Sequence, residues 1–335
     1  MHVDHSRKTV QQWLAEWMEL RRDRLSPTTL HRDQGFIDRD VLPAIGGIHL
    51  QDLKTGHLDT LYADLRAGRR SKRPDKPLSK KPLSKSTVAK LHRILHKALK
   101  DAVRKQLVVT NVADFADPPR PGRSTAARED AWSIDEAQAF LKGSVDHPMF
   151  SAFWLALFTG MRLGEVAGLR WNLVRLEDDQ PSLIVADTRV DAGGTVEKPP
   201  KTGHTRKVDL DPATTEVMKA HKMAAHEWRT VNLEMPWADE DRHVFENAAG
   251  VPIRPDSLSQ AFSREVRRLG IRHIPLKGLR HTHITWAIEA GGNPKAVADR
   301  VGHANPTMTM NVYSHVSPGV DAALAAAVAD KFTSA

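Results

Sequence analysis

Four basic side chains lie within seven residues in the segment IPLKGLRHTHITW, Ile274–Trp286. They are Lys277, Arg280, His281 and His283, and the residues around them are mostly apolar. Cations at this spacing repel one another, and partial burial makes their charged forms still less favourable. The cluster therefore predicts that an anion binds in this part of the molecule.

Three other stretches carry side chains that could join this cluster. FTGMRLGEVAGLRW places Arg162 after a glycine turn and at the start of a predicted helix, so that its guanidinium can point into a cleft. EKPPKTGHTRKVDL places Lys201 at the tip of a predicted β-hairpin. RVGHANPTMTMNVYSHV contains His303 and Tyr313, one of only two tyrosines in the chain. Taken singly, each of these is more often an ordinary surface or packing residue.

Taken together, these residues form a reagent set suited to phosphodiester chemistry, with Glu165 as the nearby acid. Arginine side chains pair bidentately with phosphate oxygens and stabilise the charge that develops on a pentacovalent phosphorus. No acidic cluster accompanies them, whereas magnesium-dependent transfer normally needs carboxylate ligands. We therefore predict neither a metal nor another cofactor.

Other catalytic signatures are absent from the sequence. There is no GxSxG, no GxxxxGK and no GxGxxG motif. His92 and His96 have the i, i+4 spacing of some zinc ligands, but the residues around them, including Arg93 between them, are strongly cationic. We interpret these two histidines as DNA-facing or solvated.

In their order, these motifs resemble those of the tyrosine recombinase (phage integrase) family, and the resemblance covers nearly the whole chain from about Lys8. TGMRLGE is similar to the box of the first arginine, PKTGHTR to the lysine-bearing β-hairpin, and LKGLRHTH to the H-x-L-R-H-T box. VGHANPTMTMNVYSHV resembles the ending LGH…T…YSH. The two arginines are 118 residues apart, and a further 23 and then 10 residues lead to His303 and Tyr313.

The resemblance implies a role for each residue. The implied catalytic residues are Tyr313, Arg162, Arg280, Lys201, His303 and Lys277, and the supporting residues are Glu165 and His281. Tyr313 would attack a scissile phosphate of duplex DNA, forming a 3′-phosphotyrosyl bond and releasing a 5′-hydroxyl, with Lys201 as the general acid. The partner strand's 5′-hydroxyl would reverse the step, so that neither ATP nor metal is needed.

The resemblance also implies partners. Strand exchange would proceed through a Holliday junction in a homotetramer bound to a double-stranded attachment or recombination site. An excision factor and a host DNA-bending protein are further candidate partners. The protein would act on DNA in the cytoplasm of a bacterial host cell.

Lys277 departs from the family pattern, which usually has histidine at this position. A protonated lysine could bind a non-bridging phosphate oxygen as a point charge. It could act as a base only if burial among cations lowered its pKa by several units. We favour the charge role.

The charge of the chain is unevenly distributed. The net charge is +8, but the segment from Arg66 to Lys105 alone carries +13, which leaves −5 for the remainder. A basic segment of this kind indicates a polyanion partner, most simply nucleic acid, although a solvated charged face is the ordinary alternative. The predicted DNA contacts are Lys80, Lys81, Lys85, Lys90, Arg93, Lys97, Lys100 and Arg104.

Composition excludes several other classes of protein. The absence of cysteine excludes a disulfide framework, a thiolate nucleophile and Cys-ligated zinc, and it fits a reducing cytosol. The start MHVDHSRKTVQQW has no apolar region of the signal-peptide type. The longest apolar run, Met149–Phe158, is broken by Ser151 and is too short to span a membrane, so no membrane partner is expected.

Hydrophobic periodicity predicts an α+β, mainly helical protein. We expect a helical core-type DNA-binding domain over 1–116, a linker over 117–130, and a mixed catalytic domain with a small antiparallel sheet over 131–335. A basic helix opened by Ser86 should form one side of the first domain. The tail VDAALAAAVAD resembles the helix that family members dock onto a neighbouring subunit, and packing on its own domain is the alternative.

Two competing functions stay open at the level of sequence. A type IB topoisomerase shares the chemistry but relaxes supercoils as a monomer. A catalytically impaired, sequence-specific DNA-binding protein is conceivable because of Lys277. The YSHV ending and the compact first domain favour the recombinase.

Overall fold

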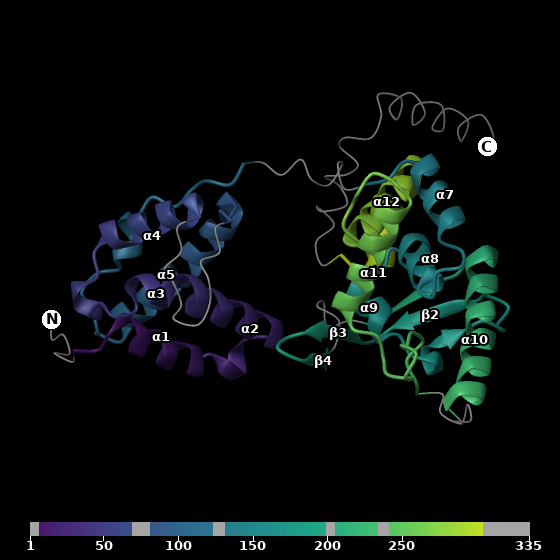
Figure 1. Ribbon diagram of the computed structural model, residues 1–335, viewed down its shortest axis with the longest axis horizontal. Helices are drawn as coiled ribbons and strands as arrows, with labels where there is room; N and C mark the ends of the chain where they lie inside the picture. Colours follow the sequence, from purple (N-terminus) through teal and green to yellow (C-terminus); the bar gives the residue numbers. More distant parts are fainter. Residues whose placement is uncertain (1–6, 69–80, 123–130, 199–204, 234–240, 304–335) are drawn as a thin grey trace, which may run out of the picture. The chain divides into compact units, whose positions relative to one another are not determined.

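The computed structural model describes residues 7–68, 81–122, 131–198, 205–233 and 241–303. The chain divides into two compact units, one built mainly from residues 1–124 and the other mainly from residues 125–335 (Figure 1). Lys80, Lys201, Tyr313 and the Ala-rich tail lie outside the described residues. Within the described residues, no helix has the length and apolar character needed to cross a membrane.

The first unit is helical throughout its described residues. Its helices are α1 (Val10–Glu19), α2 (Pro27–Phe36), α3 (Leu42–Ile45), α4 (Thr55–Ala67) and α5 (Lys85–Arg104). Pro43 does not interrupt the helical path of the chain. It lies in the first turn of α3, where a missing N–H leaves no intrahelical bond unmade, and α3 ends at Gly46 instead.

Two tryptophans of α1 anchor it to α5. Trp13 and Trp17 are fully buried, and the indole Nε1 of Trp13 donates to the backbone oxygen of Ala98 at 3.1 Å. Trp17 Nε1 donates to Asp101 Oδ2 at 2.9 Å. The apolar face of α5 therefore packs in the core of this unit.

The opposite face of α5 is basic and exposed, as predicted. The exposed residues along it are Lys85, Lys90, Arg93, Lys97, Lys100 and Arg104, and Lys81 is exposed just before the helix. The helix begins two residues earlier than expected, because Ser84 rather than Ser86 is its N-cap and accepts from the Thr87 amide.

The two histidines of α5, which we interpreted as DNA-facing or solvated, are partly exposed and also have protein partners. Tyr62 Oη lies 2.9 Å from His92 Nδ1, and His96 Nε2 lies 2.6 Å from Asp114 Oδ1. They tie α5 to α4 and to the 3-10 turn Val112–Phe115. Spacing on the helix did not reveal these partners because they come from other elements.

The second unit combines helices with short strands. Its helices are α7 (Ile134–Gly143), α8 (Phe150–Thr159), α9 (Leu163–Gly168), α10 (Pro212–Leu233), α11 (Pro255–Arg268), α12 (Lys277–Glu289) and α13 (Pro294–Val301). Its strands are β1 (Val174–Arg175), β2 (Ser182–Val185), β3 (Thr188–Asp191), β4 (Thr195–Lys198) and β5 (Arg206–Asp209). This agrees with the predicted α+β class.

The strands form two antiparallel sheets where the sequence suggested one. One sheet has the order β1-β2-β5, and β3 pairs with β4 in the other. Among the described residues the strands before and after Lys201 belong to different sheets, and the hairpin tip predicted at Lys201 itself lies outside the described residues. The turn between Asp191 and Thr195 closes the β3–β4 hairpin instead, helped by Gly193 in the left-handed region at φ 76°.

An aromatic cluster fills the core of the second unit. Trp132, Phe140, Phe153 and Phe262 are buried, with ring centroids 5.0–5.6 Å apart. Ser133 and Glu136 form a capping box at the start of α7. These contacts hold α7, α8 and α11 as one rigid support for the loops that follow them.

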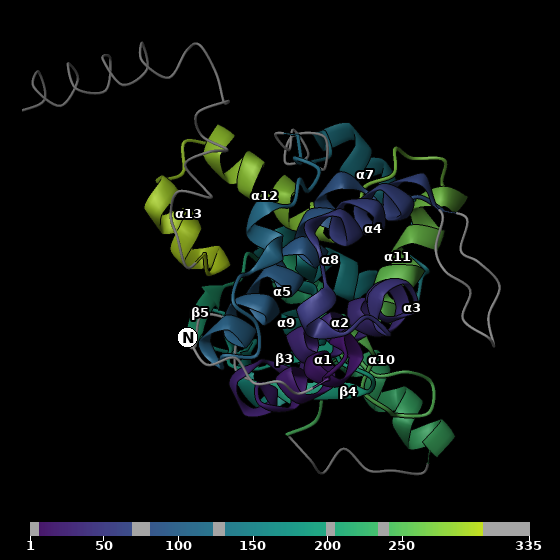
Figure 2. The ribbon, with the colours of Figure 1, turned by 90° about the vertical axis from the view of Figure 1, so that its left-hand side faces the viewer.

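Gly160 is the point where α8, α12 and α13 meet. It ends α8 in the left-handed conformation at φ 64°, and a Cβ there would lie 2.7 Å from His283 Cδ2 and 2.9 Å from Val301 Cγ1. α12 and α13 lie side by side through Ile284, Ile288 and Val297 (Figure 2). Only glycine fits this junction without displacing one of the two helices.

Replacing Leu91 with alanine should lower the free energy of unfolding by about 2–5 kcal/mol, because it removes a fully buried side chain of α5 and leaves a cavity. Urea denaturation followed by circular dichroism measures this. Lys90→Ala, one residue earlier on the exposed face, should change the free energy of unfolding by about 0.5 kcal/mol or less. Equal effects of the two changes would contradict the assignment of the faces of α5.

Candidate active site

Arg162 is positioned at the start of α9 by Glu165. It is the N-cap residue of this helix, and its backbone N–H donates to Glu165 Oε2 at 2.8 Å. Its Nη1 donates to Glu165 Oε1 at 2.8 Å, and its Nη2 donates to the backbone oxygen of Gly302 at 2.5 Å. Both terminal nitrogens of the Arg162 guanidinium are therefore held by protein groups.

Glu165 is a buried carboxylate shared by two arginines. It is 1% exposed, and Arg206 Nη1 and Nη2 donate to its two oxygens at 3.1 and 2.7 Å. Burial acts to raise the pKa of Glu165, but the hydrogen bonds and charges of Arg206 and Arg162 outweigh it, so the pKa lies below its ordinary value. Glu165 is therefore ionised and supplies the negative charge that lets two guanidinium groups lie close together.

Arg280 is the more deeply buried of the two predicted arginines. It lies on the first turn of α12 and is 9% exposed, and its Nη1 donates to the backbone oxygens of Gly160 at 2.8 Å and Val301 at 2.5 Å. Its Nη2 is buried and has no hydrogen-bond partner among the described residues. Burial, and then the charge of Arg162, lower the pKa of Arg280 to about 9, so the group stays protonated at neutral pH.

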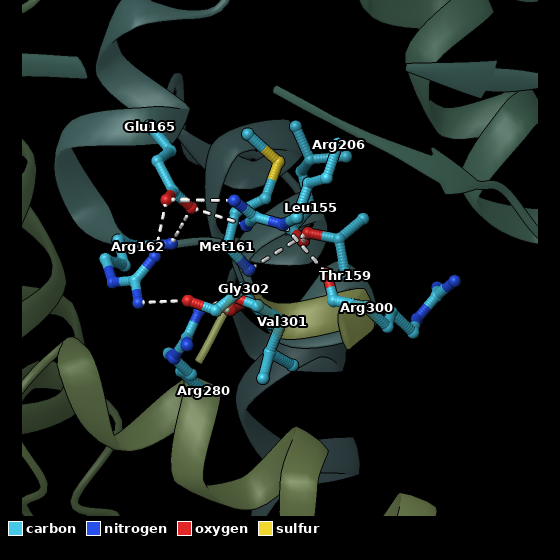
Figure 3. A network of polar contacts seen from close by, with 11 residues as sticks. Leu155, Thr159, Met161, Arg162, Glu165, Arg206, Arg280, Arg300, Val301 and Gly302 are labelled. Atoms are coloured by element: carbon cyan, nitrogen blue, oxygen red, sulfur yellow. Dashed lines mark hydrogen bonds and ion pairs between the residues drawn. The ribbon is translucent and has the colours of Figure 1, made fainter. Parts of the chain in front are cut away.

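Three arginines converge on three consecutive carbonyls at the C-terminal end of α13 (Figure 3). Arg206 Nε donates to the oxygen of Arg300 at 2.9 Å, Arg280 to that of Val301, and Arg162 to that of Gly302. The last carbonyls of a helix have no intrahelical partner and carry the negative end of its dipole. The end of α13 thus acts as an internal acceptor that aligns the arginines.

His303 follows this turn directly and is half-buried. Burial, and then the charges of Arg280, Arg162, His281 and Arg206, lower its pKa to about 4. It is therefore an uncharged imidazole at neutral pH in the DNA-free protein. His281, half-buried on α12, belongs to the same electrostatic group, which fits a supporting position.

A cavity of about 90 Å³ lies beside Arg162 and Arg280. Its polar lining comes from Arg162, Arg280 and Lys277, and the rest of its wall is apolar. Lys277 itself is exposed. Within the described residues, no group of three or more His, Asp or Glu side chains is placed to hold a metal ion. Arg162, Arg280 and Lys277 thus place three cationic side chains on the wall of an otherwise apolar cavity.

The structure brings together most of the residues that the sequence singled out. Arg162, Glu165, Lys277, Arg280, His281 and His303 lie in one place, while Lys201 and Tyr313 lie outside the described residues. Sequence reasoning missed Arg206. Its signal was an arginine two residues before the buried Val208, and hence on the inward face of a strand, where a charged side chain requires a partner.

Comparison with known proteins identifies the family. The model of the phage integrase family matches residues 134–319, and that of the phage integrase N-terminal SAM-like domain matches residues 9–65. The chain belongs to the phage integrase family of tyrosine recombinases. Membership explains why the boxes around the two arginines and His303 occur in one order along the chain.

One relative illustrates the likeness in sequence. The tyrosine recombinase XerC-like protein of Caldanaerobacter subterraneus subsp. tengcongensis is 26% identical over 211 residues, which cover 60% of this chain and 54% of that protein. This chain thus matches about half the length of that relative.

The structural matches are to integrases bound to DNA. The integrase of transposon Tn1549 in complex with a circular intermediate DNA has a TM-score of 0.71 at 19% identity, covering 96% of this chain and 99% of that one. A lambda integrase tetramer bound to a Holliday junction has a TM-score of 0.65 at 15% identity, covering 89% and 78%. These likenesses show that the fold is shared.

His283 lies on α12 beside Gly160 and should make the stability of the protein depend on pH. Burial, and then the charge of Arg300, lower its pKa to about 4, whereas an unfolded histidine titrates near about 6.5. Between these values the unfolded chain binds the proton more readily, so stability should be present above about pH 6.5 and lost as the pH falls towards 4. The free energy of unfolding should be about 1 kcal/mol lower at pH 5.5 than at pH 7.5 on account of His283 alone.

Urea denaturation of His283→Gln at the two pH values measures the contribution of His283 to the free energy of unfolding, because glutamine does not titrate. The difference between the two pH values should shrink relative to the native chain, whereas it should be retained in His273→Gln, whose histidine is exposed. An unchanged difference in His283→Gln would contradict the burial of a neutral His283.

Proposed function

We propose that this integrase-family protein is a site-specific DNA recombinase of a phage or other mobile element, cutting and rejoining duplex DNA through a 3′-phosphotyrosyl intermediate. The observation that carries the proposal is the buried Nη2 of Arg280, which has no hydrogen-bond partner among the described residues, in a residue that lines a cavity together with Arg162 and Lys277. A buried donor left without a partner costs about 1–3 kcal/mol, and more for a charged group. A phosphate oxygen would remove that cost.

In this proposal the arginines act on the phosphate. Arg162 and Arg280 bind its non-bridging oxygens and stabilise the charge that grows on them as phosphorus becomes pentacovalent. His303, uncharged at neutral pH, hydrogen bonds to the same group, and exposed Lys277 contributes a positive charge at the edge of the cavity. Because these groups are held before DNA arrives, little reorganisation is needed when it binds.

The covalent step uses the two residues outside the described part of the chain. The Tyr313 oxygen forms a bond to phosphorus as the bond from phosphorus to the 5′-oxygen breaks, and Lys201 gives that leaving oxygen a proton. The 5′-hydroxyl of a partner strand then attacks the phosphotyrosine and restores the tyrosine. The number of phosphodiester bonds is conserved, so that the exchange requires no ATP.

The two units would divide the work. We assign residues 1–116 to a core-type DNA-binding domain, 117–130 to the linker and 131–335 to the catalytic domain. The basic face of α5 would bind backbone phosphates of the recombination site, and four subunits would assemble on the DNA. The solved lambda integrase tetramer on a Holliday junction supports this arrangement.

A nicked suicide substrate carrying the recombination site tests the chemistry. The native chain should form an adduct that survives denaturing electrophoresis, and Tyr313→Phe should form none. Arg280→Ala should slow adduct formation by about 10²–10³-fold, because it removes a donor aimed at the developing charge. Arg267→Ala, which removes an exposed arginine of α11, should retain the native rate.

The same experiment separates the competing functions. Absence of any adduct with the native chain would support a DNA-binding protein without catalysis. Relaxation of a supercoiled plasmid that lacks the site, at substoichiometric protein, would support a topoisomerase instead.

The role of α5 predicts a change in salt dependence. Replacing Lys90, Arg93 and Lys100 with alanine should reduce the slope of log affinity against log salt concentration by about 2–3, since each lost phosphate contact contributes about 0.9. Fluorescence anisotropy with labelled duplex measures this slope. A control that replaces exposed Arg22, Arg24 and Lys54 in the same unit should retain the native slope, and equal losses in both would contradict the assignment.

A further inference from the structure

Arg206 differs from the other arginines of the site in that its nitrogens are all occupied. Its Nε donates to the backbone oxygen of Arg300 at 2.9 Å, and its Nη1 and Nη2 donate to the two oxygens of Glu165 at 3.1 and 2.7 Å. Its side chain is 11% exposed. Arg280, in contrast, keeps a buried Nη2 without a hydrogen-bond partner among the described residues. The hydrogen-bonding capacity of Arg206 is therefore used by protein groups, whereas Arg280 keeps a donor that a ligand could use.

The partners of Arg206 belong to two different parts of the active site. Glu165 holds Arg162 through its backbone N–H and its Nη1. The Arg300 carbonyl lies in the last turn of α13, which leads through Gly302 to His303. One side chain on β5 thus connects the element that presents Arg162 with the element that presents His303.

Gly302 makes this connection close. It adopts the left-handed conformation at φ 73°, and a Cβ there would lie 2.8 Å from Arg206 Nη1 and 3.0 Å from Arg206 Cζ. The same residue accepts a hydrogen bond from Arg162 Nη2 through its carbonyl oxygen. The guanidinium of Arg206 therefore lies against the backbone whose carbonyl orients Arg162. Arg206 thus reaches Arg162 in two ways, through Glu165 and through Gly302.

We propose that Arg206 is a positioning residue of the active site, which sets the orientation of Arg162 and the place of His303 without touching the DNA. The proposal rests on the proposed function, because it assigns Arg206 a part in the cleavage step. Its effect on the reaction should be large, since a misplacement of about 1 Å in a catalytic group can cost about 10²-fold in rate.

Replacing Arg206 with lysine distinguishes the effect of its positive charge from the effect of its hydrogen-bonding geometry. Arg206→Lys keeps a positive charge near Glu165, but an ammonium is a point donor without the planar fork of guanidinium. It cannot hold both Glu165 oxygens and the Arg300 carbonyl in the same arrangement. A loss of activity in Arg206→Lys would therefore report on positioning rather than on the neutralisation of Glu165.

Single-turnover cleavage of the suicide substrate at saturating protein tests the proposal. The rate constant of adduct formation should fall about 10²-fold in Arg206→Lys, while the concentration for half-maximal DNA binding should stay within about twofold of native. A merely structural role would instead reduce the amplitude, by lowering the folded fraction, and leave the rate constant of the folded molecules unchanged. Arg175→Lys, which changes an exposed arginine on β1 of the same sheet, should match the native chain in both the rate constant and the DNA affinity.

Gly302→Ala provides a second variant that leaves Arg206 in the chain. Its added Cβ should displace the guanidinium and lower the rate constant in the same way. Native rate constants in Arg206→Lys and Gly302→Ala would overturn the proposal. A tenfold or greater loss of DNA affinity in Arg206→Lys would also overturn it, since Arg206 would then act as a DNA contact.

Hydrogen–deuterium exchange tests positioning independently of activity. In Arg206→Lys, peptides covering 162–168 and 294–303 should exchange faster than in the native chain, while those of α7 and α11 should not. If the native chain forms no adduct, the proposed function fails, and native exchange in these two peptides would separately show that Arg206 does not hold them.

Discussion

The carboxyl end of α13 is the contact on which the candidate active site depends. Carbonyls of residues 300, 301 and 302 accept hydrogen bonds from Arg206, Arg280 and Arg162, which come from β5, α12 and the start of α9. Side chains separated by long stretches of sequence are thereby aligned by one helix end. Gly160 and Gly302, both in the left-handed region, let the backbones approach closely enough for this to happen.

The electrostatics of the site follow from that arrangement. Three guanidinium groups are balanced by one buried carboxylate, Glu165, and by carbonyl dipoles that carry only partial charge. Burial, and then the neighbouring positive charges, lower the pKa values of Arg280 and His303. A phosphate group would supply the missing negative charge, so the site holds free energy of electrostatic repulsion that DNA binding can release.

Much of this site could be predicted from sequence, because its residues occur in short motifs whose local structure is set by neighbours. Arg162 at a helix start and Glu165 one turn later are local features, and so is the end of α8 at Gly160. Arg206 could not be assigned in this way, because its partners lie 41 and 94 residues away and the strand pattern fixes only its inward direction. The pairing of β4 with β3 and of β5 with β2 could not be predicted for a similar reason, since strand pairing is decided by tertiary packing rather than by the turn sequence alone.

The most direct test of this account is a crystal structure of the protein bound to its recombination-site DNA, with Tyr313→Phe to prevent cleavage. The account predicts a phosphate oxygen within hydrogen-bond distance, about 2.7–3.2 Å, of Arg280 Nη2, with Arg206 still bound to Glu165 and to the Arg300 carbonyl. A scissile phosphate that lies away from Arg280, or that draws Arg206 off Glu165 to bind it directly, would contradict it.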